Sequence, residues 1–134
     1  MLNRRESREA VLGLVYELDY NKDISTQELY QNALELREIE GNDFMRETFF
    51  GVCENLADID ALISEKSEGW KTERISKVSM AVMRLCTYEL KCTAVPFNIA
   101  INEAIELVKK YDDEKAKGFV NGVLNSIAEE LGKK

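Results

Sequence analysis

The chain of 134 residues has no histidine and only one proline. Without histidine it has no imidazole zinc ligand, no Ser-His or Cys-His catalytic pair and no imidazole general base. It also contains no CxxC, no GxxxxGK[ST] and no GxGxxG, the short motifs of thiol redox, phosphate-binding and dinucleotide-binding proteins. We therefore expect no metal ion, no cofactor and no catalytic residue, and we expect that the protein is not an enzyme.

Cysteines and long apolar segments are also scarce. The cysteines Cys53, Cys86 and Cys92 show no paired spacing, so we expect reduced thiols rather than a disulfide framework. No apolar run approaches the roughly 20 residues that cross a bilayer, and residues 1–8 are polar and charged, unlike a signal peptide. We expect a cytoplasmic protein with no membrane segment.

What the chain does contain is abundant charge, unevenly distributed. Hydrophobic residues make up 45% and charged residues 32%, which suits one globular domain over residues 1–134. The net charge of -7 divides into +1 for residues 1–16, -10 for residues 17–68 and +2 for residues 69–134. Because polyanion binding depends on local potential, the two ends stay compatible with nucleic acid. The acidic middle predicts a solvated face or, less simply, a surface for a basic partner.

Apolar residues recur at helical spacing along nearly the whole chain, and no segment alternates convincingly with the period of two that strands show. We expect an all-α, compact single-domain bundle in two helical halves, roughly residues 1–68 and 70–131, with a boundary near Gly69. One apolar stripe from Met45 to Ile63 predicts a single continuous helix there. Helix starts are predicted at Asn3, at Ser25 or Thr26, at Asn42 or Asp43, near Thr72, at Asn98, and at Asp112 or Asp113.

The second half of the chain contains a series of recognisable motifs. They are Val82-Met83-Arg84-Leu85, Tyr88-Glu89-Leu90, Val95-Pro96, Ala100-Ile101-Asn102-Glu103-Ala104 and Phe119-Val120-Asn121-Gly122-Val123-Leu124. In this order the motifs resemble the NusB family of bacterial transcription antitermination factors. With an arginine-rich start, the similarity runs from Arg4 to about Ile127. It implies about seven helices, binding to the boxA element of nascent ribosomal RNA, and a heterodimer with NusE, a small-subunit ribosomal protein. It also implies indirect association with other Nus factors and RNA polymerase, and leaves a homodimer open.

Arginines at the start of the chain are the first candidate RNA contacts. Arg4, Arg5 and Arg8 fall within about a 100° sector of a helix, so their guanidinium forks could hold successive phosphates. The alternative is a solvated helix start balanced by Glu6 and Glu9. The family resemblance favours the RNA contact.

A second set of candidate RNA contacts lies near the C-terminus. Lys115 and Lys117 could contact phosphate, and Phe119 could offer a stacking face for a base. Phe119 is equally compatible with a place in the core, or at its edge with one face exposed. Lys109 and Lys110 extend the basic surface or are simply solvated.

Glycine and asparagine interrupt the apolar pattern of the last two helices. Gly118 and Gly122 lie one turn apart, and each costs about 1 kcal/mol relative to alanine inside a helix. We predict that they let another helix approach closely. For Asn102 and Asn121 we favour a structural role that ties neighbouring backbones together over direct contact with RNA.

The resemblance also implies a partner surface. Family members carry an aromatic residue matching Tyr16 and a commonly acidic residue matching Ser79, and both positions are associated with NusE. Tyr16 is retained, whereas Ser79 is not acidic. This departure puts one contact in question unless neighbouring residues compensate.

Two other functions stay open on the sequence. NusB-like domains precede the catalytic domain in some ribosomal RNA cytosine methyltransferases, although residues 1–134 offer no cofactor-binding sheet and no catalytic cysteine motif. A helical protein-interaction module without RNA binding would also suit the acidic net charge.

Overall fold

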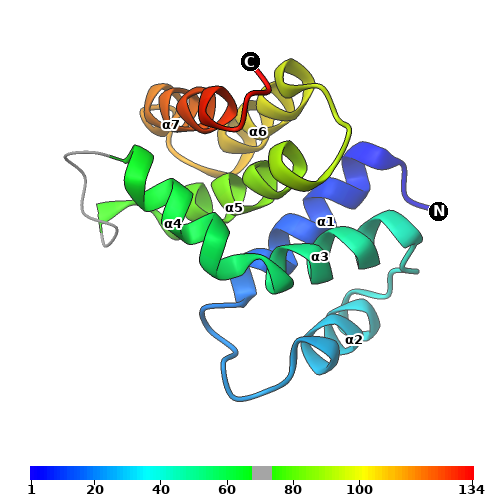
Figure 1. Ribbon diagram of the computed structural model, residues 1–134. Coiled ribbons are helices and arrows are strands. Elements are labelled where there is room, and N and C mark those ends of the chain that lie inside the picture. The colour runs from blue at the N-terminus through cyan, green and yellow to red at the C-terminus, as the bar shows by residue number, and fades with distance from the viewer. Residues whose placement is uncertain (68–73) are drawn as a thin grey trace.

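The computed structural model describes residues 1–67 and 74–134, and within them the chain forms seven α-helices and no β-strand (Figure 1). The all-α prediction is therefore confirmed for the described residues. The predicted boundary near Gly69 and the turn near Thr72 lie outside them. The helices are α1 (Arg4–Glu17), α2 (Thr26–Arg37), α3 (Asp43–Glu54), α4 (Leu56–Lys66), α5 (Lys77–Cys92), α6 (Phe97–Tyr111) and α7 (Ala116–Glu130).

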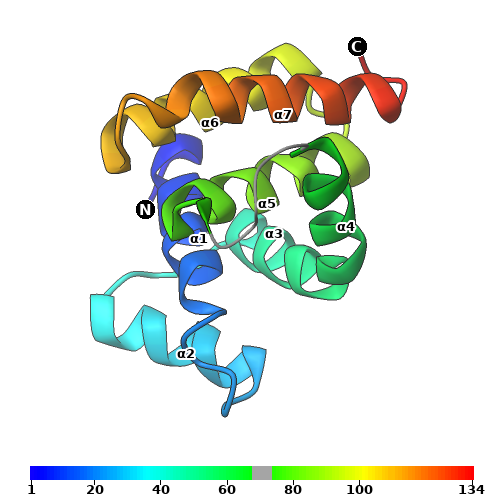
Figure 2. The ribbon, with the colours of Figure 1, turned by 90° about the vertical axis from the view of Figure 1, so that its left-hand side faces the viewer.

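Helix α5 forms the centre of the molecule. It packs against α1, α3, α4, α6 and α7. Most of its residues from Ser79 to Leu90 are buried, which leaves little of the helix in contact with water. Figures 1 and 2 show α6 and α7 side by side over one side of α5, and α2 at the opposite end of the molecule. Helix α5 thus fixes the positions of α1 and α6, which carry much of the candidate site.

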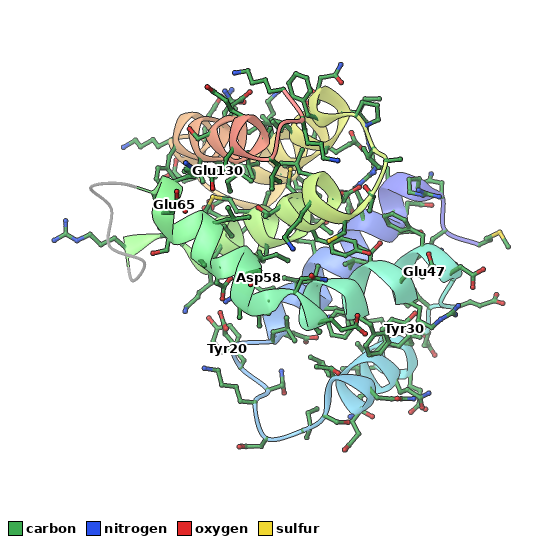
Figure 3. All side chains as sticks on the ribbon, in the orientation of Figure 1. Tyr20, Tyr30, Glu47, Asp58, Glu65 and Glu130 are labelled. Carbon is green, nitrogen blue, oxygen red and sulfur yellow. The ribbon has the colours of Figure 1, made fainter. Side chains whose placement is uncertain are left out.

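The outermost helix, α2, packs on the rest of the molecule through its buried residues Leu29, Tyr30 and Ala33. The ring of Tyr30 lies 5.9 Å from that of Phe49 and 5.3 Å from that of Phe50, between ring centroids. Figure 3 shows Tyr30 reaching from α2 toward α3. Leu36 on the same helix is almost fully exposed. The described residues include no helix long and apolar enough to cross a membrane.

Three of the predicted helix starts are confirmed. The Asn3 side chain accepts a hydrogen bond from the Glu6 N–H at 2.8 Å, and the Glu6 carboxylate accepts one from the Asn3 N–H at 2.9 Å, a complete capping box. Ser25 caps α2, and the Asn42 side chain accepts from the Met45 N–H at 2.8 Å to cap α3. These local bonds set where each helix begins.

The predicted continuous helix from Met45 to Ile63 is wrong, because α3 ends at Glu54 and α4 begins at Leu56, with Asn55 between them. The Asn55 side chain donates to the Gly51 carbonyl at 2.8 Å, and its backbone leaves the helical region at ψ 12°. Such a local side-chain bond competes with the helical ladder. The break lets α4 turn and pack against α5 and α7.

The predicted starts of the last two helices also need correction. Pro96, not Asn98, is the N-cap of α6, and its carbonyl accepts the N–H groups of Ile99 and Ala100. Lys115 is the N-cap of α7, and the side chains of the described residues make no cap bond there. The Asp113 carboxylate, one of the two predicted caps, does accept the Lys115 N–H at 3.0 Å, but in the turn just before the helix.

The packing role predicted for Gly118 and Gly122 is wrong. Both are exposed, and a Cβ added at either would meet no packed neighbour within 4 Å among the described residues. The close approach occurs instead at Gly51, where a Cβ would collide with the Tyr88 ring. A larger residue at this position would require that ring to move.

The structural role favoured for Asn102 and Asn121 is also wrong, because both side chains are exposed. Asn121 accepts hydrogen bonds from Asn125 one turn along the same helix, so it ties no second backbone to α7.

All three cysteines are free thiols, as expected. Cys86 is buried, and its burial raises the pKa of that thiol. Burial also raises the pKa of Cys53 to about 11. Both thiols therefore stay protonated at neutral pH and act as small apolar side chains.

Candidate nucleic-acid interface

The start of α1 brings the three predicted arginines together, but in three different environments. Arg8 is buried, with only 6% of its surface exposed. Its Nε and Nη2 donate to the two carboxylate oxygens of Glu89 at 3.0 and 2.8 Å, and its Nη1 reaches Glu103 at 3.4 Å. Arg8 therefore joins α1 to α5 and α6.

The buried pair explains why Arg8 does not fit the expected row of phosphate contacts. Hydrogen bonds to Glu89 outweigh the effect of burial and raise the pKa of the Arg8 guanidinium. A phosphate could reach it only if the guanidinium left both carboxylates. Breaking a buried pair by removing one partner typically costs 3–5 kcal/mol, because a charge is left without compensation. In the structure without RNA, Arg8 is therefore held by Glu89 and Glu103, with little of its surface exposed.

Arg5 is hydrogen-bonded to one carboxylate, and most of its side chain is exposed. Its Nη2 donates to Glu103 Oε2 at 2.7 Å and its Nε to Glu103 Oε1 at 3.2 Å, while 66% of the side-chain surface stays exposed. The hydrogen bonds from Arg5 lower the pKa of the Glu103 carboxyl. Arg5 is thus oriented by one carboxylate and still presents donors to solvent.

Arg4 is exposed and contacts an aromatic ring instead of a carboxylate. Its Cζ lies 4.2 Å from the ring centroid of Phe44, at the start of α3. Within residues 1–67 and 74–134, no carboxylate forms an ion pair with Arg4. Of the three arginines, Arg4 is therefore the most available to an anionic ligand.

A depression of about 310 Å³ lies beside these arginines. The end of α6 supplies Lys109 and Lys110 to it. Lys110 donates to Glu9 at 2.7 Å, and Tyr111 donates to the same carboxylate at 3.0 Å, which together lower the pKa of Glu9. The lysines expected to extend the basic surface do lie next to Arg5, although carboxylates offset much of their charge. Its lining consists of Arg5, Arg8, Glu9, Glu103, Glu106, Leu107, Lys109 and Lys110.

The candidate residues at the start of α7 are Lys115, Lys117 and Phe119. Lys115 is exposed, and Lys117 forms a single ion pair with Glu114 at 3.5 Å, one turn away. Phe119 is half-buried and packs against the core, so part of its ring surface is accessible. This agrees with the expected place at the edge of the core.

Of the two predicted partner residues, Tyr16 lines a depression and Ser79 is the chain neighbour of Val78, another residue of its lining. Tyr16 is 37% exposed, and its ring lies 5.3 Å from that of Tyr20. It lines an apolar depression of about 300 Å³ with Gly13, Val78 and Tyr111. Val78 comes directly before Ser79 on α5, which places the second predicted residue just behind this surface.

Ser79 itself is buried, and a carboxylate covers it. Its hydroxyl and that of Ser76 both donate to Asp112, which follows α6. Partial burial alone would raise the pKa of the Asp112 carboxyl, but the two serine hydrogen bonds outweigh it and lower the pKa. An ionised carboxylate is therefore fixed beside Ser79 at neutral pH.

The acidic middle of the chain forms an exposed surface on α3 and α4. Figure 3 shows Glu47 and Asp58 on the outer side of these helices. Near the C-terminus, Lys66 bridges Glu65 at 3.3 Å and Glu130 at 2.8 Å, which joins α4 to α7. In the part of the chain that the structure describes, no group of three acidic or cysteine side chains could hold a metal ion.

Sequence reasoning did not find Phe44, Glu103 or Asp112 as parts of the site. Glu103 lies 98 residues from Arg5, and Asp112 lies 33 residues from Ser79. Helical periodicity carries no signal for such distant pairs. Phe44 had one available signal, because it directly follows the predicted cap of α3, but nothing in the sequence pairs it with Arg4.

The fold and the site together define an all-helical protein that presents arginines and lysines at two helix starts. A family model described as the NusB family matches residues 5–129. The transcription antitermination protein NusB of Acetivibrio thermocellus is 42% identical over 130 residues, covering 94% of this chain and 88% of that protein. The chain therefore belongs to the NusB family, as its motifs indicated.

Solved structures agree with this assignment. NusB of T. maritima superimposes with a TM-score of 0.86 at 35% identity, covering 96% of this chain and 92% of that one. A structure of the antitermination factors NusB and NusE in complex with double-stranded RNA gives a TM-score of 0.82 at 26% identity, covering 95% of this chain and 96% of that one.

Proposed function

We propose that this protein is a transcription antitermination factor that binds the boxA element of nascent ribosomal RNA together with NusE. The observation that carries the proposal is family membership over almost the whole chain, with a fold like that of NusB bound to NusE and RNA. The proposed role is one of binding rather than catalysis. It places the protein in the cytoplasm, where its complex joins other Nus factors and RNA polymerase and favours elongation.

The start of α1 supplies the first RNA contacts. Arg4 and Arg5 offer exposed guanidinium groups to phosphate, and Arg guanidinium matches phosphate oxygens with two parallel hydrogen bonds. Arg8 supports these contacts indirectly, because it holds α1 against α5 and α6. The arginines therefore form one unit in which an inner side chain positions two outer ones.

The start of α7 supplies the second set. Lys115 and Lys117 contribute point charges to the RNA backbone, and the accessible part of Phe119 contributes a stacking surface for a base. Helix α6 lies next to both sets, since Glu103 pairs with Arg5 and α6 packs along α7. Single-stranded RNA that contacts both helix starts would pass over α6.

NusE occupies the depression around Tyr16. The apolar floor of Val78 and Tyr111 suits a side chain of the partner, and Asp112 beside Ser79 supplies the acidic group that Ser79 lacks. A ribosomal protein is typically basic, so the acidic surface of residues 17–68 would also favour its approach. Homodimer formation through α1 would compete with RNA for Arg4 and Arg5.

Titration of fluorescent boxA RNA and of a scrambled RNA, each with and without NusE, tests the proposal. We expect tight, salt-sensitive binding to boxA that NusE strengthens, and weaker binding to the scrambled RNA. Asp112→Asn should weaken NusE binding, with Asp113→Asn as the matched control. Equal, weak binding to both RNAs in the presence of NusE would contradict the proposal, and NusE binding without RNA binding would favour an interaction module.

A further inference from the structure

Arg4 and Phe44 meet at the junction of α1 and α3. The Arg4 Cζ lies 4.2 Å from the centroid of the Phe44 ring, and the Cζ of Arg8 lies 5.6 Å from the same centroid. Phe44 is half-buried, whereas Arg4 is exposed. The Arg4 guanidinium thus lies over an aromatic ring while the side chain stays exposed to solvent.

The contact is built into the fold. Asn42, the cap of α3, donates from its side-chain nitrogen to the Ser7 hydroxyl at 2.9 Å. This bond ties the start of α3 to the first turn of α1, so Phe44 is held beside Arg4. The Asn3 capping box fixes the first turn of α1 from the other side. Hydrogen bonds therefore fix both helix starts, the one that carries Arg4 and the one that carries Phe44.

The donors of Arg4 differ from those of its two neighbours. Arg5 uses two of its nitrogens on Glu103, and Arg8 uses its nitrogens on Glu89 and Glu103. In the described part of the chain, no carboxylate pairs with Arg4. A guanidinium is planar, weakly hydrated and able to stack on a ring with one face and on a base with the other.

We propose that Arg4 and Phe44 form a composite stacking platform for a single nucleobase. The base lies on the outer face of the Arg4 guanidinium, and Phe44 supports the inner face. Because the ring restricts the guanidinium before RNA arrives, less side-chain freedom is lost on binding. The inference rests on the proposed RNA-binding function and deepens it, since it assigns Arg4 to a base rather than only to a phosphate.

The test combines protein variants with RNA that lacks single bases. Affinities of wild type, Arg4→Lys, Arg4→Ala, Phe44→Leu and Phe44→Tyr are measured on boxA RNA and on a series in which one nucleotide at a time is abasic. Arg4→Lys keeps the positive charge but removes the planar guanidinium on which a base can stack. We expect it to weaken binding to intact RNA by about tenfold. We expect no further loss on the RNA whose missing base is the one that stacks.

Phe44 is tested by coupling and by rescue. Phe44→Leu should weaken binding to intact RNA but add little to Arg4→Ala, because both remove the same platform. Phe44→Tyr should retain wild-type affinity, since it keeps the ring. Urea denaturation of each variant separates lost binding from lost folding, and the tyrosine variant keeps the test valid if Phe44→Leu is unstable.

Three results would overturn the platform. Arg4→Lys could bind like wild type, the Arg4→Lys loss could be the same on every abasic RNA, or Phe44→Leu could match Phe44→Tyr. Each would make Arg4 a phosphate contact only. Loss of boxA preference with the abasic pattern intact would contradict the proposed function and leave the platform standing. No binding to any RNA would contradict both.

Discussion

The starts of α1 and α7 carry the same sign of charge but hold it in different ways. At α1, Arg5 and Arg8 are fixed by carboxylates from α5 and α6, and Arg4 lies on Phe44. At α7, Lys115 is exposed, and Lys117 has one long contact with Glu114 in the neighbouring turn. The first region is oriented before any ligand arrives, whereas the second presents point charges with few ion-pair partners among the described residues.

This difference predicts that stability and binding are coupled in one region and separate in the other. The arginine unit at α1 also holds three helices together through Arg8, so changes there reach the fold. At α7, Lys115 is exposed and Lys117 has an ion pair only with Glu114 among the described residues, so changes there should affect the ligand more than the fold. Arginine suits the first task because of its planar fork, and lysine suits the second.

Arg8→Ala should give the largest effect and would show the coupling most clearly. It leaves Glu89 buried beside an empty space, which should lower the free energy of unfolding by about 3–5 kcal/mol. Urea denaturation measures this loss. Lys115→Ala is the matched control from α7 and should change stability by less than about 0.5 kcal/mol. A similar stability for both variants would remove the contrast between the regions.

Arg4→Ala combined with Arg5→Ala tests binding at the same helix start. We expect an affinity loss for boxA RNA of about 10- to 100-fold. The slope of log affinity against log salt concentration should also fall by about 2, since two cations that contact phosphate are removed. Fluorescence anisotropy at several salt concentrations measures both quantities. Lys22→Ala, an exposed cation between α1 and α2, should change neither. An unchanged slope in the double variant would remove these arginines from the interface.

Lys115→Ala combined with Lys117→Ala should have a smaller effect on RNA affinity, about three- to tenfold, because a lysine side chain loses more freedom per hydrogen bond on binding than a pre-organised arginine. The melting temperature should stay at the wild-type value. The same anisotropy titration and a thermal melt measure the two. A large fall in melting temperature would mean that α7 is as tightly coupled to the fold as α1.

Gly118→Ala and Gly122→Ala should each give the smallest change, a gain in unfolding free energy of up to about 1 kcal/mol. An added Cβ meets open space, and alanine favours the helix. Urea denaturation measures the gain. A loss of stability would restore the idea that another helix packs closely on these glycines.

Local chemistry explains why part of the fold could be predicted. Asn3, Ser25 and Asn42 were found because a capping bond needs only residues three positions apart. The apolar period of α5 and α7 likewise identified buried Val82, Val120 and Ile127. Each of these features is settled within one or two helical turns.

Other features depended on distant parts of the chain or were read incorrectly. The burial of Arg8 depends on Glu89, which lies 81 residues away, so the three arginines looked alike in sequence. The exposed face of α7 did have a signal. Gly118, Asn121 and Gly122 recur at helical spacing opposite the apolar positions, which marks a solvent face rather than a packed one.

The most direct test of the two-region interface is a map of backbone amide chemical shifts. Isotope-labelled protein bound to unlabelled NusE is compared before and after boxA RNA is added. We predict that the largest changes fall at residues 3–8, at Phe44 and at residues 115–119, with little change on the outer surface of α3 and α4 around Glu47 and Asp58. Changes confined to that acidic surface, with none at the two helix starts, would contradict the proposed interface.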